Sequence, residues 1–305
     1  MNVDGPALSR PAVPIGFGAG NLYGGKQRAQ SLRLVAAALD AGITWFDTAR
    51  LYGHGAADGL LGEALEGRRD RVTIIGKAGI LPSRISFAHR VHAKLAALRL
   101  LPAPAPVEPK FGAFEPSELR ASVETSLRAL RTDYLDGLLL HEVPAETARR
   151  DEVTDLLEIL RREGKVRAFG AATSLEDTLS LARNRPSAYE VLQFASSAWT
   201  DNAGCVRTLA GDALVVTHSA LGAPLAGLIQ RLQHDEALRA RARELGIDPA
   251  RPNLGPRLLA LAMLRNPGGV TLFSSTKTER IAEAVTALAI TVDEAMAAER
   301  FIQAP

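Results

Sequence analysis

Short apolar runs rich in β-branched and aromatic residues alternate with helical patterns along nearly the whole chain of 305 residues. Each run predicts a buried strand, because it is short and is bounded by glycine or polar turn residues. The eight predicted strands occupy residues 15–20, 43–47, 71–76, 134–140, 166–171, 189–194, 212–217 and 269–273. The predicted helices occupy residues 28–41, 56–65, 116–130, 151–163, 175–183, 225–245, 254–265 and 277–288, with an extra helix at 292–301.

Strict alternation of strands and helices predicts an α/β fold with a parallel sheet, and eight repeats predict that the sheet closes into a (β/α)8 barrel. No linker rich in serine and glycine divides the chain, so residues 1–305 are expected to form a single domain. A doubly wound open sheet is the alternative. The helix at 116–130 is expected to be capped by Ser117.

Charge and cysteine content limit the partners and locations to be expected. The 36 basic and 34 acidic residues leave a net charge of +2 without a basic block, so a nucleic-acid surface is not expected. Residues 1–11 lack the apolar core of a signal peptide, and no apolar run reaches the roughly 20 residues of a membrane helix. Cys205 is the only cysteine, which excludes an internal disulfide and suits a reducing compartment. We therefore expect a soluble cytoplasmic protein that acts on a small molecule.

Two long connections interrupt the alternation, after the third and the seventh predicted strand. Residues 79–116 contain six prolines, and the helix expected at 87–100 is followed by a stretch, 102–109, that cannot be helical. Such loops often act as lids or binding loops, so a role at the functional site is expected; a surface excursion without a role is the alternative. The second connection, 220–253, carries the basic amphipathic helix predicted at 225–245.

Polar residues that suit catalysis stand at or just after the carboxyl ends of five predicted strands. They are Asp47, Lys77, His141, Gln193 and His218. In a closed parallel barrel these strand ends meet around one mouth, where such folds place their chemistry. An open sheet would not gather them, and this favours the barrel.

Four residues form a set that suits proton transfer. Tyr52 follows Asp47 by five residues, and a free tyrosine has a pKa of about 10, too high for acid–base work at neutral pH. A buried Lys77 ammonium is expected to lower the pKa of Tyr52, and Asp47 is expected to keep that ammonium charged. His141 can hydrogen-bond a substrate oxygen. The set suits acid–base catalysis at an alcohol or carbonyl, and hydride transfer would then require a nicotinamide cofactor; no spacing typical of metal ligands is found.

The turn after the first predicted strand resembles a dinucleotide-binding motif only in part. Residues 15–20 read IGFGAG, but the third glycine of GxGxxG would fall at Asn21, so the motif is absent. Gly18 and Ala19 are instead expected to let a bound cofactor approach the backbone at the strand end.

Segments spread over the chain resemble the aldo-keto reductase superfamily, and in particular the bacterial branch that includes aldose and pyridoxal dehydrogenases. They are DAGITWFDTARLYG (40–53), LLGEAL (60–65), IIGKAG (74–79), SVETSLRALRTDYLDGLLLH (122–141), EGKVRAFGAATS (163–174) and PGGVTLFSSTKTERIAEAV (267–285). The resemblance implies a barrel that binds NADP(H), or NAD(H) as the alternative, in an extended form across its mouth. It implies a carbonyl–alcohol interconversion, a monomer or weak homo-oligomer, and a catalytic tetrad of Asp47, Tyr52, Lys77 and His141, with Tyr52 as proton donor in reduction.

The resemblance extends to the nicotinamide contacts, with substitutions. Gln193 matches the residue that contacts the carboxamide, and His218 stands where the family commonly has a stacking tyrosine. Ala172 and Thr173 replace a serine–asparagine pair, so Thr173 or Ser174 must supply the missing contact.

Contacts to the rest of the cofactor are implied in the same way. Ser219 and Leu221 match the loop that binds the pyrophosphate. Ser275 and Arg280 match residues that hold the adenosine 2′-phosphate, a dianion that suits a guanidinium, whereas Ser274 replaces a frequent lysine. The resemblance therefore implies a preference for NADP(H) over NAD(H).

The substrate pocket is expected to be formed by the two long connections with Tyr23, Trp45 and His141. Basic residues in the first connection suggest an anionic or polyhydroxylated substrate, and a solvated basic face is the alternative; these residues are Arg84, Arg90 and Lys94. The N-terminal hairpin usual in the family is not evident in residues 1–14, where prolines oppose strand pairing.

Two other functions are compatible with these residues. A Schiff-base aldolase would use Lys77 as its nucleophile, although pairing with Asp47 should keep that amine protonated. An NADP-binding regulatory subunit with little catalysis would account for the altered contacts at Ala172 and His218.

Overall fold

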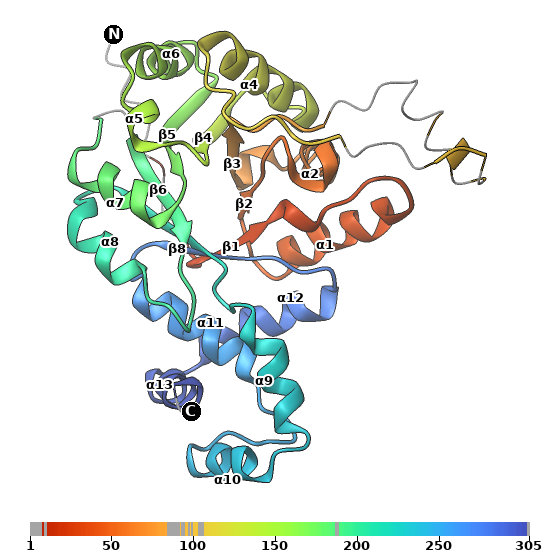
Figure 1. Ribbon diagram of the computed structural model, residues 1–305, viewed down its shortest axis with the longest axis vertical. Coiled ribbons are helices and arrows are strands. Elements are labelled where there is room, and N and C mark those ends of the chain that lie inside the picture. The colour runs from red at the N-terminus through yellow and green to blue at the C-terminus, as the bar shows by residue number, and fades with distance from the viewer. Residues whose placement is uncertain are drawn as a thin grey trace.

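The computed structural model describes residue 8 and residues 11–83, 92, 95–96, 98, 100–102, 107–186 and 189–303. Eight parallel strands form a closed barrel in sequence order (Figure 1). They are β1 (Ile15–Gly18), β2 (Trp45–Asp47), β3 (Thr73–Ala78), β4 (Leu135–His141), β5 (Val166–Ala172), β6 (Tyr189–Ala195), β7 (Leu214–His218) and β8 (Val270–Phe273). The ring closes because β8 pairs with β1, which places Phe17 beside Phe273. The predicted (β/α)8 barrel is confirmed, and the open-sheet alternative is wrong.

Helices lie around the outside of the barrel, and the pair α9 and α10 extends away from it at the bottom of Figure 1. In the part of the chain that the structure describes, the α-helices are α1 (Arg28–Asp40), α2 (Ala57–Ala64), α4 (Pro116–Leu130), α5 (Ala145–Ala148), α6 (Asp151–Arg162), α7 (Leu175–Arg183), α8 (Ala203–Ala210), α9 (Pro224–Leu232), α10 (Glu236–Glu244), α11 (Leu254–Arg265), α12 (Thr278–Val285) and α13 (Val292–Ile302). The extra helix expected near the C-terminus is α13, which packs against α11.

Helix α6 illustrates how the sequence produces this outer layer. Its apolar residues recur at helical spacing and are buried, and they are Val153, Leu156, Leu157 and Leu160. Acidic residues occupy its first turn and arginines its last, which complements the helix dipole. The stripe therefore faces the barrel while the charged face points to solvent.

The strands separate two cores. Alternation along β2 turns Phe46 outward into the layer between barrel and helices, while Trp45 points into the barrel. Side chains from the other strands fill the interior around Trp45, among them Ile75, Leu139 and Val191. Asp47 lies two residues beyond Trp45 and so shares its face. The filled interior thus ends, at the carboxyl end of β2, in a carboxylate at the barrel mouth.

Three sequence expectations about helices are wrong in detail. Ser117 is not a cap: α4 follows Glu115, which makes no side-chain cap hydrogen bond, and Pro116 occupies the first helical position, where its missing N–H costs nothing. The helix expected at 225–245 is broken into α9 and α10, because the Asp235 side chain accepts from the Leu238 N–H and starts a new helix. Helix α8, between β6 and β7, was not expected.

The first long connection leaves and rejoins the barrel through a short two-stranded contact. Leu81 and Lys110 exchange backbone hydrogen bonds of 2.9 and 3.1 Å. The helix expected at 87–100 falls largely on residues outside the described part of the chain. The same holds for the basic residues Arg84, Arg90 and Lys94, and for most of the N-terminal segment expected to lack a hairpin.

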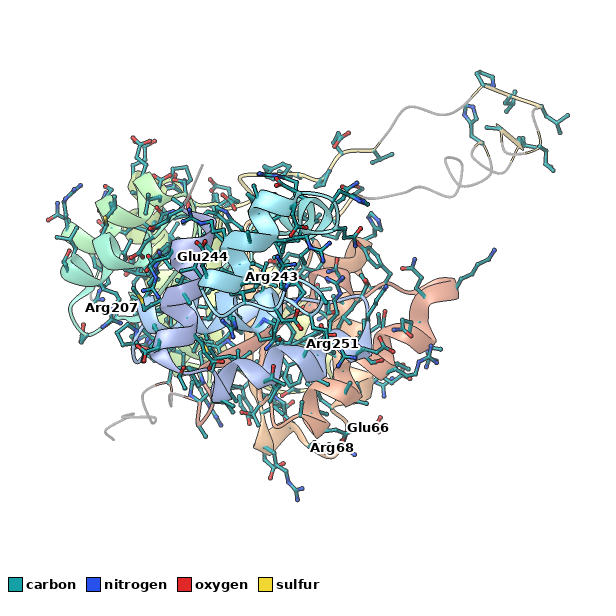
Figure 2. The ribbon with its side chains drawn as sticks, turned by 90° about the horizontal axis from the view of Figure 1, so that it is seen from below. Glu66, Arg68, Arg207, Arg243, Glu244 and Arg251 are labelled. Atoms are coloured by element: carbon teal, nitrogen blue, oxygen red, sulfur yellow. The ribbon has the colours of Figure 1, made fainter. Side chains whose placement is uncertain are left out.

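Charged side chains are distributed over the outer surface with both signs mixed. Seen from below, Arg243 and Glu244 of α10 lie over one part of the molecule, and Glu66 and Arg68 over another (Figure 2). This agrees with the nearly balanced charge of the sequence. Among the described residues, no helix is both long and apolar enough to cross a membrane.

Candidate active site

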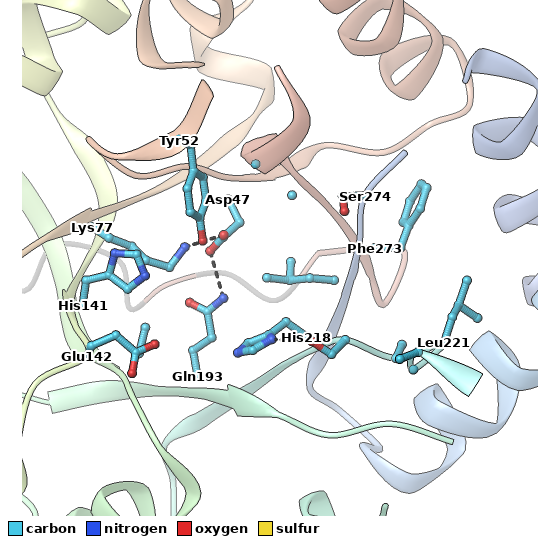
Figure 3. Close-up of a pocket in the computed structure, with 18 residues that line it drawn as sticks. Asp47, Tyr52, Lys77, His141, Glu142, Gln193, His218, Leu221, Phe273 and Ser274 are labelled. Atoms are coloured by element: carbon cyan, nitrogen blue, oxygen red, sulfur yellow. Dashed lines mark hydrogen bonds and ion pairs between the residues drawn. The ribbon is translucent and has the colours of Figure 1, made fainter. Parts of the chain in front are cut away.

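The five strand-end residues meet at the barrel mouth as the sequence predicts. The side chains of Asp47, Lys77, His141, Gln193 and His218 line one cavity of about 540 Å³. The structure brings Tyr52 into the same cavity from the loop that follows β2 (Figure 3). Residues from separate strands thus surround a single space, because the closed sheet turns all carboxyl ends to the same side.

Lys77 and Asp47 form a buried ion pair at the bottom of this cavity. Their side chains are only 1% and 3% exposed, and the Lys77 ammonium donates to an Asp47 carboxylate oxygen (Figure 3). The same ammonium lies 3.4 Å from the Thr48 carbonyl oxygen. Burial alone would lower the pKa of Lys77, but Asp47 and Tyr52 outweigh it and the pKa is raised. Lys77 therefore stays protonated, as the sequence argument requires.

Tyr52 is held above this pair by a tight turn. It begins a short 3-10 helix, Tyr52–Gly55, and its ring centre lies 4.9 Å from the Lys77 ammonium nitrogen. Gly53 follows with φ +57°, and a Cβ at that position would lie 1.8 Å from the Leu22 carbonyl oxygen. Only glycine can occupy this position, so the Tyr–Gly pair in the sequence is a steric requirement of the turn.

The expected direction of the Tyr52 pKa shift is wrong. Burial raises the pKa of Tyr52, and the nearby Lys77 charge and its hydrogen bond, which lower it, do not fully compensate. The sequence argument counted the ammonium but not the loss of water around the phenol. The phenol is therefore protonated across the neutral range.

His141 faces Tyr52 across the cavity. The two rings are arranged edge to face, with centroids 5.9 Å apart. Burial, together with the charge of Lys77 and the neighbouring His218, lowers the pKa of His141 to about 3. The imidazole is consequently neutral at physiological pH, so one ring nitrogen can donate a hydrogen bond to an oxygen in the cavity.

Only one of the two polar atoms in the Gln193 side-chain amide has a hydrogen-bond partner among the described residues. Its amide nitrogen donates to Asp47 over 3.1 Å, so Asp47 bridges Lys77 and Gln193. Its amide oxygen is buried, and no described residue donates to it. A buried acceptor without a partner is costly, which indicates that a bound group supplies the donor.

The remaining predicted cofactor residues are only partly gathered around the cavity. Gly18, His218, Ser219 and Leu221 line it, whereas Ala19 is fully buried outside the lining.

The two residues expected to replace the missing nicotinamide contact are already engaged. The Thr173 hydroxyl donates to the Val143 carbonyl oxygen over 2.8 Å, and Ser174 caps α7 by accepting from the Asp177 N–H. Neither residue lines the cavity. The contact of Thr173 or Ser174 with the cofactor stays a prediction.

Ser275 and Arg280, expected at the adenosine end, lie outside the cavity lining, whereas Ser274 is part of it. Ser274 is exposed at its edge. Ser275 is buried, and its hydroxyl donates to the Lys277 carbonyl oxygen and accepts from the Lys277 N–H, which fixes the turn before α12. Arg280 is exposed on α12, where its guanidinium is open to an anion.

A second cavity of about 520 Å³ lies on the other side of Tyr52, and the two cavities share Tyr52 and Gly20. Tyr23 and His54 form part of its wall, with ring centroids 5.6 Å apart, and residues 107–109 of the first long connection close it. Tyr23 therefore lies in a cavity beside Tyr52. Trp45 does not: it is fully buried inside the barrel, so its assignment to the substrate pocket is wrong.

Two acidic residues in these cavities were missed by the sequence reasoning. Glu142 lines the first cavity next to His141, and Glu108 lines the second. Glu142 directly follows a predicted catalytic strand end, and this position was the available signal. Glu108 carries no comparable sequence signal, because it lies in a proline-rich loop without regular pattern.

The model of the Aldo/keto reductase family matches residues 14–300. This chain belongs to that family. The uncharacterized oxidoreductase YcsN of Bacillus subtilis is 35% identical over 148 residues, which are 47% of this chain and 43% of that protein. A 6-dehydroglucose reductase of Novosphingobium aromaticivorans is 32% identical over 177 residues, 55% of this chain and 49% of that protein. The matched stretches thus span about half the length of these relatives or less.

Solved structures show the same fold over nearly the whole chain. The holo form of the aldo-keto reductase AKR11C1 from Bacillus halodurans has a TM-score of 0.67 at 20% identity, covering 94% of this chain and 91% of that one. An aldo-keto reductase from Klebsiella pneumoniae in complex with NADPH has a TM-score of 0.64 at 24% identity, covering 96% and 92%. At these identities the likeness is one of fold.

Proposed function

We propose that this protein is an NADP(H)-dependent oxidoreductase that interconverts an aldehyde or ketone with the corresponding alcohol. The observation that carries the proposal is the buried Lys77–Asp47 pair beneath Tyr52, with neutral His141 facing the same space. Membership of the aldo/keto reductase family and the relatives named as oxidoreductases support the reaction class.

The cavity suits a nicotinamide. The Gln193 amide oxygen, buried and without a donor among the described residues, is an acceptor for a carboxamide N–H. His218 offers a ring face in the same cavity, and Gly18 leaves the β1 end without a side chain. NADPH is present in the related structure from Klebsiella pneumoniae. When bound, the cofactor supplies a hydride to the carbonyl carbon or, when oxidised, accepts one from the alcohol.

The side chains of this protein handle the proton. Neutral His141 donates a hydrogen bond that orients the carbonyl oxygen toward Tyr52. Tyr52, protonated because burial raises its pKa, gives its proton to that oxygen during reduction. The Lys77 ammonium stabilises the phenolate that remains, and Asp47 keeps Lys77 charged. In the oxidation direction Tyr52 must first lose its proton, so oxidation is favoured by higher pH.

The proposed substrate site is the second cavity together with the part of the first cavity beside His141 and Glu142, because the two cavities meet at Tyr52. Tyr23 and His54 give the second cavity an aromatic wall. The exposed guanidinium of Arg280 is the proposed contact for the 2′-phosphate, which would favour NADP(H) over NAD(H).

The two alternative functions differ from this proposal at Lys77 and in turnover. A Schiff-base aldolase needs a neutral amine, and the raised pKa of Lys77 in its ion pair opposes this. A regulatory subunit would bind NADPH tightly without turnover on any carbonyl.

The test is NADPH oxidation, followed at its near-ultraviolet absorbance, over a panel of aldehydes and ketones that includes sugars, pyridoxal and aromatic aldehydes. We expect Tyr52→Phe to lower kcat by about 10²–10⁴-fold while NADPH binding is retained, because only the proton donor is removed. Full activity in Tyr52→Phe would overturn the mechanism. Tight NADPH binding by the wild type without turnover on any panel member would favour the regulatory subunit.

A further inference from the structure

Glu142 carries a charge into the active-site cavity that the proposed mechanism does not use. It follows the last residue of β4, and its backbone N–H donates to the Ala172 carbonyl oxygen over 2.7 Å, which extends the pairing of β4 with β5 by one residue. Its side chain is exposed and lines the cavity on the His141 side (Figure 3). No hydrogen bond or ion pair to its carboxylate is found among the described residues.

The backbone at Glu142 adopts an unusual conformation. Its φ is +52°, in the left-handed region that residues other than glycine, asparagine and aspartate seldom adopt. Such conformations cost of the order of 1 kcal/mol or more and are concentrated at functional sites. A glutamate held here, beside a catalytic histidine, points to a role for its side chain.

Neither Asp177 nor His141, which lie near Glu142, offsets the negative charge of its carboxylate. Burial and the negative charge of Asp177 both raise the pKa of Glu142. Asp177 itself accepts from the Ala145 N–H and the Ser174 hydroxyl, so it remains a fixed acid nearby. His141 is neutral, because its pKa is lowered to about 3.

The lining of both cavities is acidic once the ion pair is set aside. Among the described lining residues the formally charged ones are Asp47, Lys77, Glu142 and Glu108. Asp47 and Lys77 compensate each other. Glu142 and Glu108 remain, one in each cavity, and neither carboxylate has a cationic partner among the residues that the structure describes.

We propose that Glu142 is a specificity-determining residue that disfavours substrates with an anionic group near the carbonyl and accepts a hydrogen bond from neutral, hydroxylated ones. The proposal rests on the proposed carbonyl–alcohol activity. A carboxylate on the substrate would meet like charge in a space with reduced solvent, whereas a hydroxyl finds an acceptor.

The first test compares two substrates of equal size that differ in charge, succinic semialdehyde and its neutral amide, 4-oxobutanamide. At pH 8 we expect the wild type to prefer the amide in kcat/KM by about tenfold or more. Glu142→Gln, which keeps the shape and removes the charge, should bring the two values within about threefold. The matched control is Glu146→Gln on α5, four residues along the chain and exposed, which removes the same negative charge outside the cavities. The control should keep the wild-type preference.

A binding measurement tests the same inference without turnover. Calorimetry on protein saturated with NADP⁺ should give benzoate a weaker affinity than benzamide, and Glu142→Gln should tighten benzoate by about tenfold while leaving benzamide nearly unchanged. Equal changes for both ligands, or an unchanged amide preference in Glu142→Gln, would overturn the inference. A variant that altered only the KM for NADPH would also overturn it, by assigning Glu142 to the cofactor. Absence of turnover on every carbonyl would count against the proposed function, and the benzoate–benzamide ratio would still decide the role of Glu142.

Discussion

The two ends of strand β4 differ in how fully the hydrogen-bonding capacity of the surrounding polar groups is used. At its carboxyl end, His141 faces the Lys77–Asp47 pair, and the cavity contains a buried Gln193 amide oxygen without a donor among the described residues. At its amino end, the Asp136 carboxylate forms an ion pair with Arg69 and accepts from Arg167 over 3.0 Å and from the Ile74 N–H over 2.9 Å. One end has unused hydrogen-bonding capacity, and the other has almost none.

Tyr134 and Tyr52, which lie near the amino and carboxyl ends of the barrel, differ in the same way. Tyr134, just before β4, lies between two guanidinium groups, with Arg69 3.9 Å and Arg167 3.8 Å from its ring centre. Tyr52 has a cation on one side only and the two cavities around it. In barrels of this kind the amino-terminal face serves stability and the carboxyl-terminal face serves chemistry. Around β4, the unused hydrogen-bonding capacity lies at the end where the catalytic residues are proposed.

The largest expected effect is on activity at the open end. Lys77→Met removes the ammonium next to Tyr52, so we expect kcat/KM for carbonyl reduction to fall about 10³-fold. The control at the saturated end is Arg69→Met, which should keep activity within about threefold because it lies far from the cavity. If Lys77→Met kept more than a tenth of the wild-type activity, the proposed placement of the catalytic residues at the carboxyl end of the barrel would be wrong.

The next effect is on stability at the saturated end. Asp136→Ala leaves the Ile74 N–H without its buried acceptor and the Arg69 guanidinium without its ion-pair partner, so we expect about 3 kcal/mol of lost unfolding free energy in urea titration. Activity below the unfolding transition should be retained. Asp133→Ala, an exposed acid three residues earlier, is the matched control and should change little. Equal effects of the two substitutions would remove the basis for calling this end a stabilising network.

The pH dependence of stability provides a third test. The pKa of His141 is lowered from 6.5 to about 3 in the folded protein, so below pH 6.5 the unfolded chain binds the extra proton. The stability linked to this neutral histidine is fully present above pH 6.5 and is lost as the pH falls toward 3. Relative to His141→Gln, the wild type should lose about 2 kcal/mol of unfolding free energy between pH 6.5 and pH 5. His234→Gln, at an exposed site, should keep the wild-type slope.

The sequence predicted the architecture because its determinants are local and repeated. Each strand is a short apolar run and each helix has an apolar stripe, and closure follows from their number and order. Asp47, Lys77 and His141 could be placed together for the same reason, since each ends a strand of one parallel sheet. The break between α9 and α10 was missed because a single capping acid, Asp235, overrode a continuous amphipathic pattern.

Features that depend on three-dimensional surroundings could not be predicted in this way. The direction of the Tyr52 pKa shift depends on how much water the folded cavity excludes, which no residue spacing reveals. Thr173 and Ser174 carry suitable hydroxyls, but both hydroxyls already form hydrogen bonds with the backbone. Thr173 donates to the Val143 carbonyl oxygen, which lies close only after folding, and Ser174 accepts from the Asp177 N–H in the first turn of α7. Trp45 and Asp47 share a face of β2, and only their depth in the barrel makes Trp45 a core residue and Asp47 a residue of the cavity.

The smallest expected effect concerns Arg280, which lies on α12 and belongs to neither end of β4. Arg280 is exposed on α12, outside the cavity lining, so its replacement should leave chemistry and folding intact. A guanidinium that contacts a 2′-phosphate would contribute binding only to NADPH, so Arg280→Gln should raise KM for NADPH by about tenfold and leave KM for NADH unchanged. Arg68→Gln, another exposed arginine (Figure 2), is the control and should alter neither value. A parallel rise for both cofactors would mean that Arg280 acts on the shared part of the dinucleotide, and the preference for NADP(H) would then need another origin.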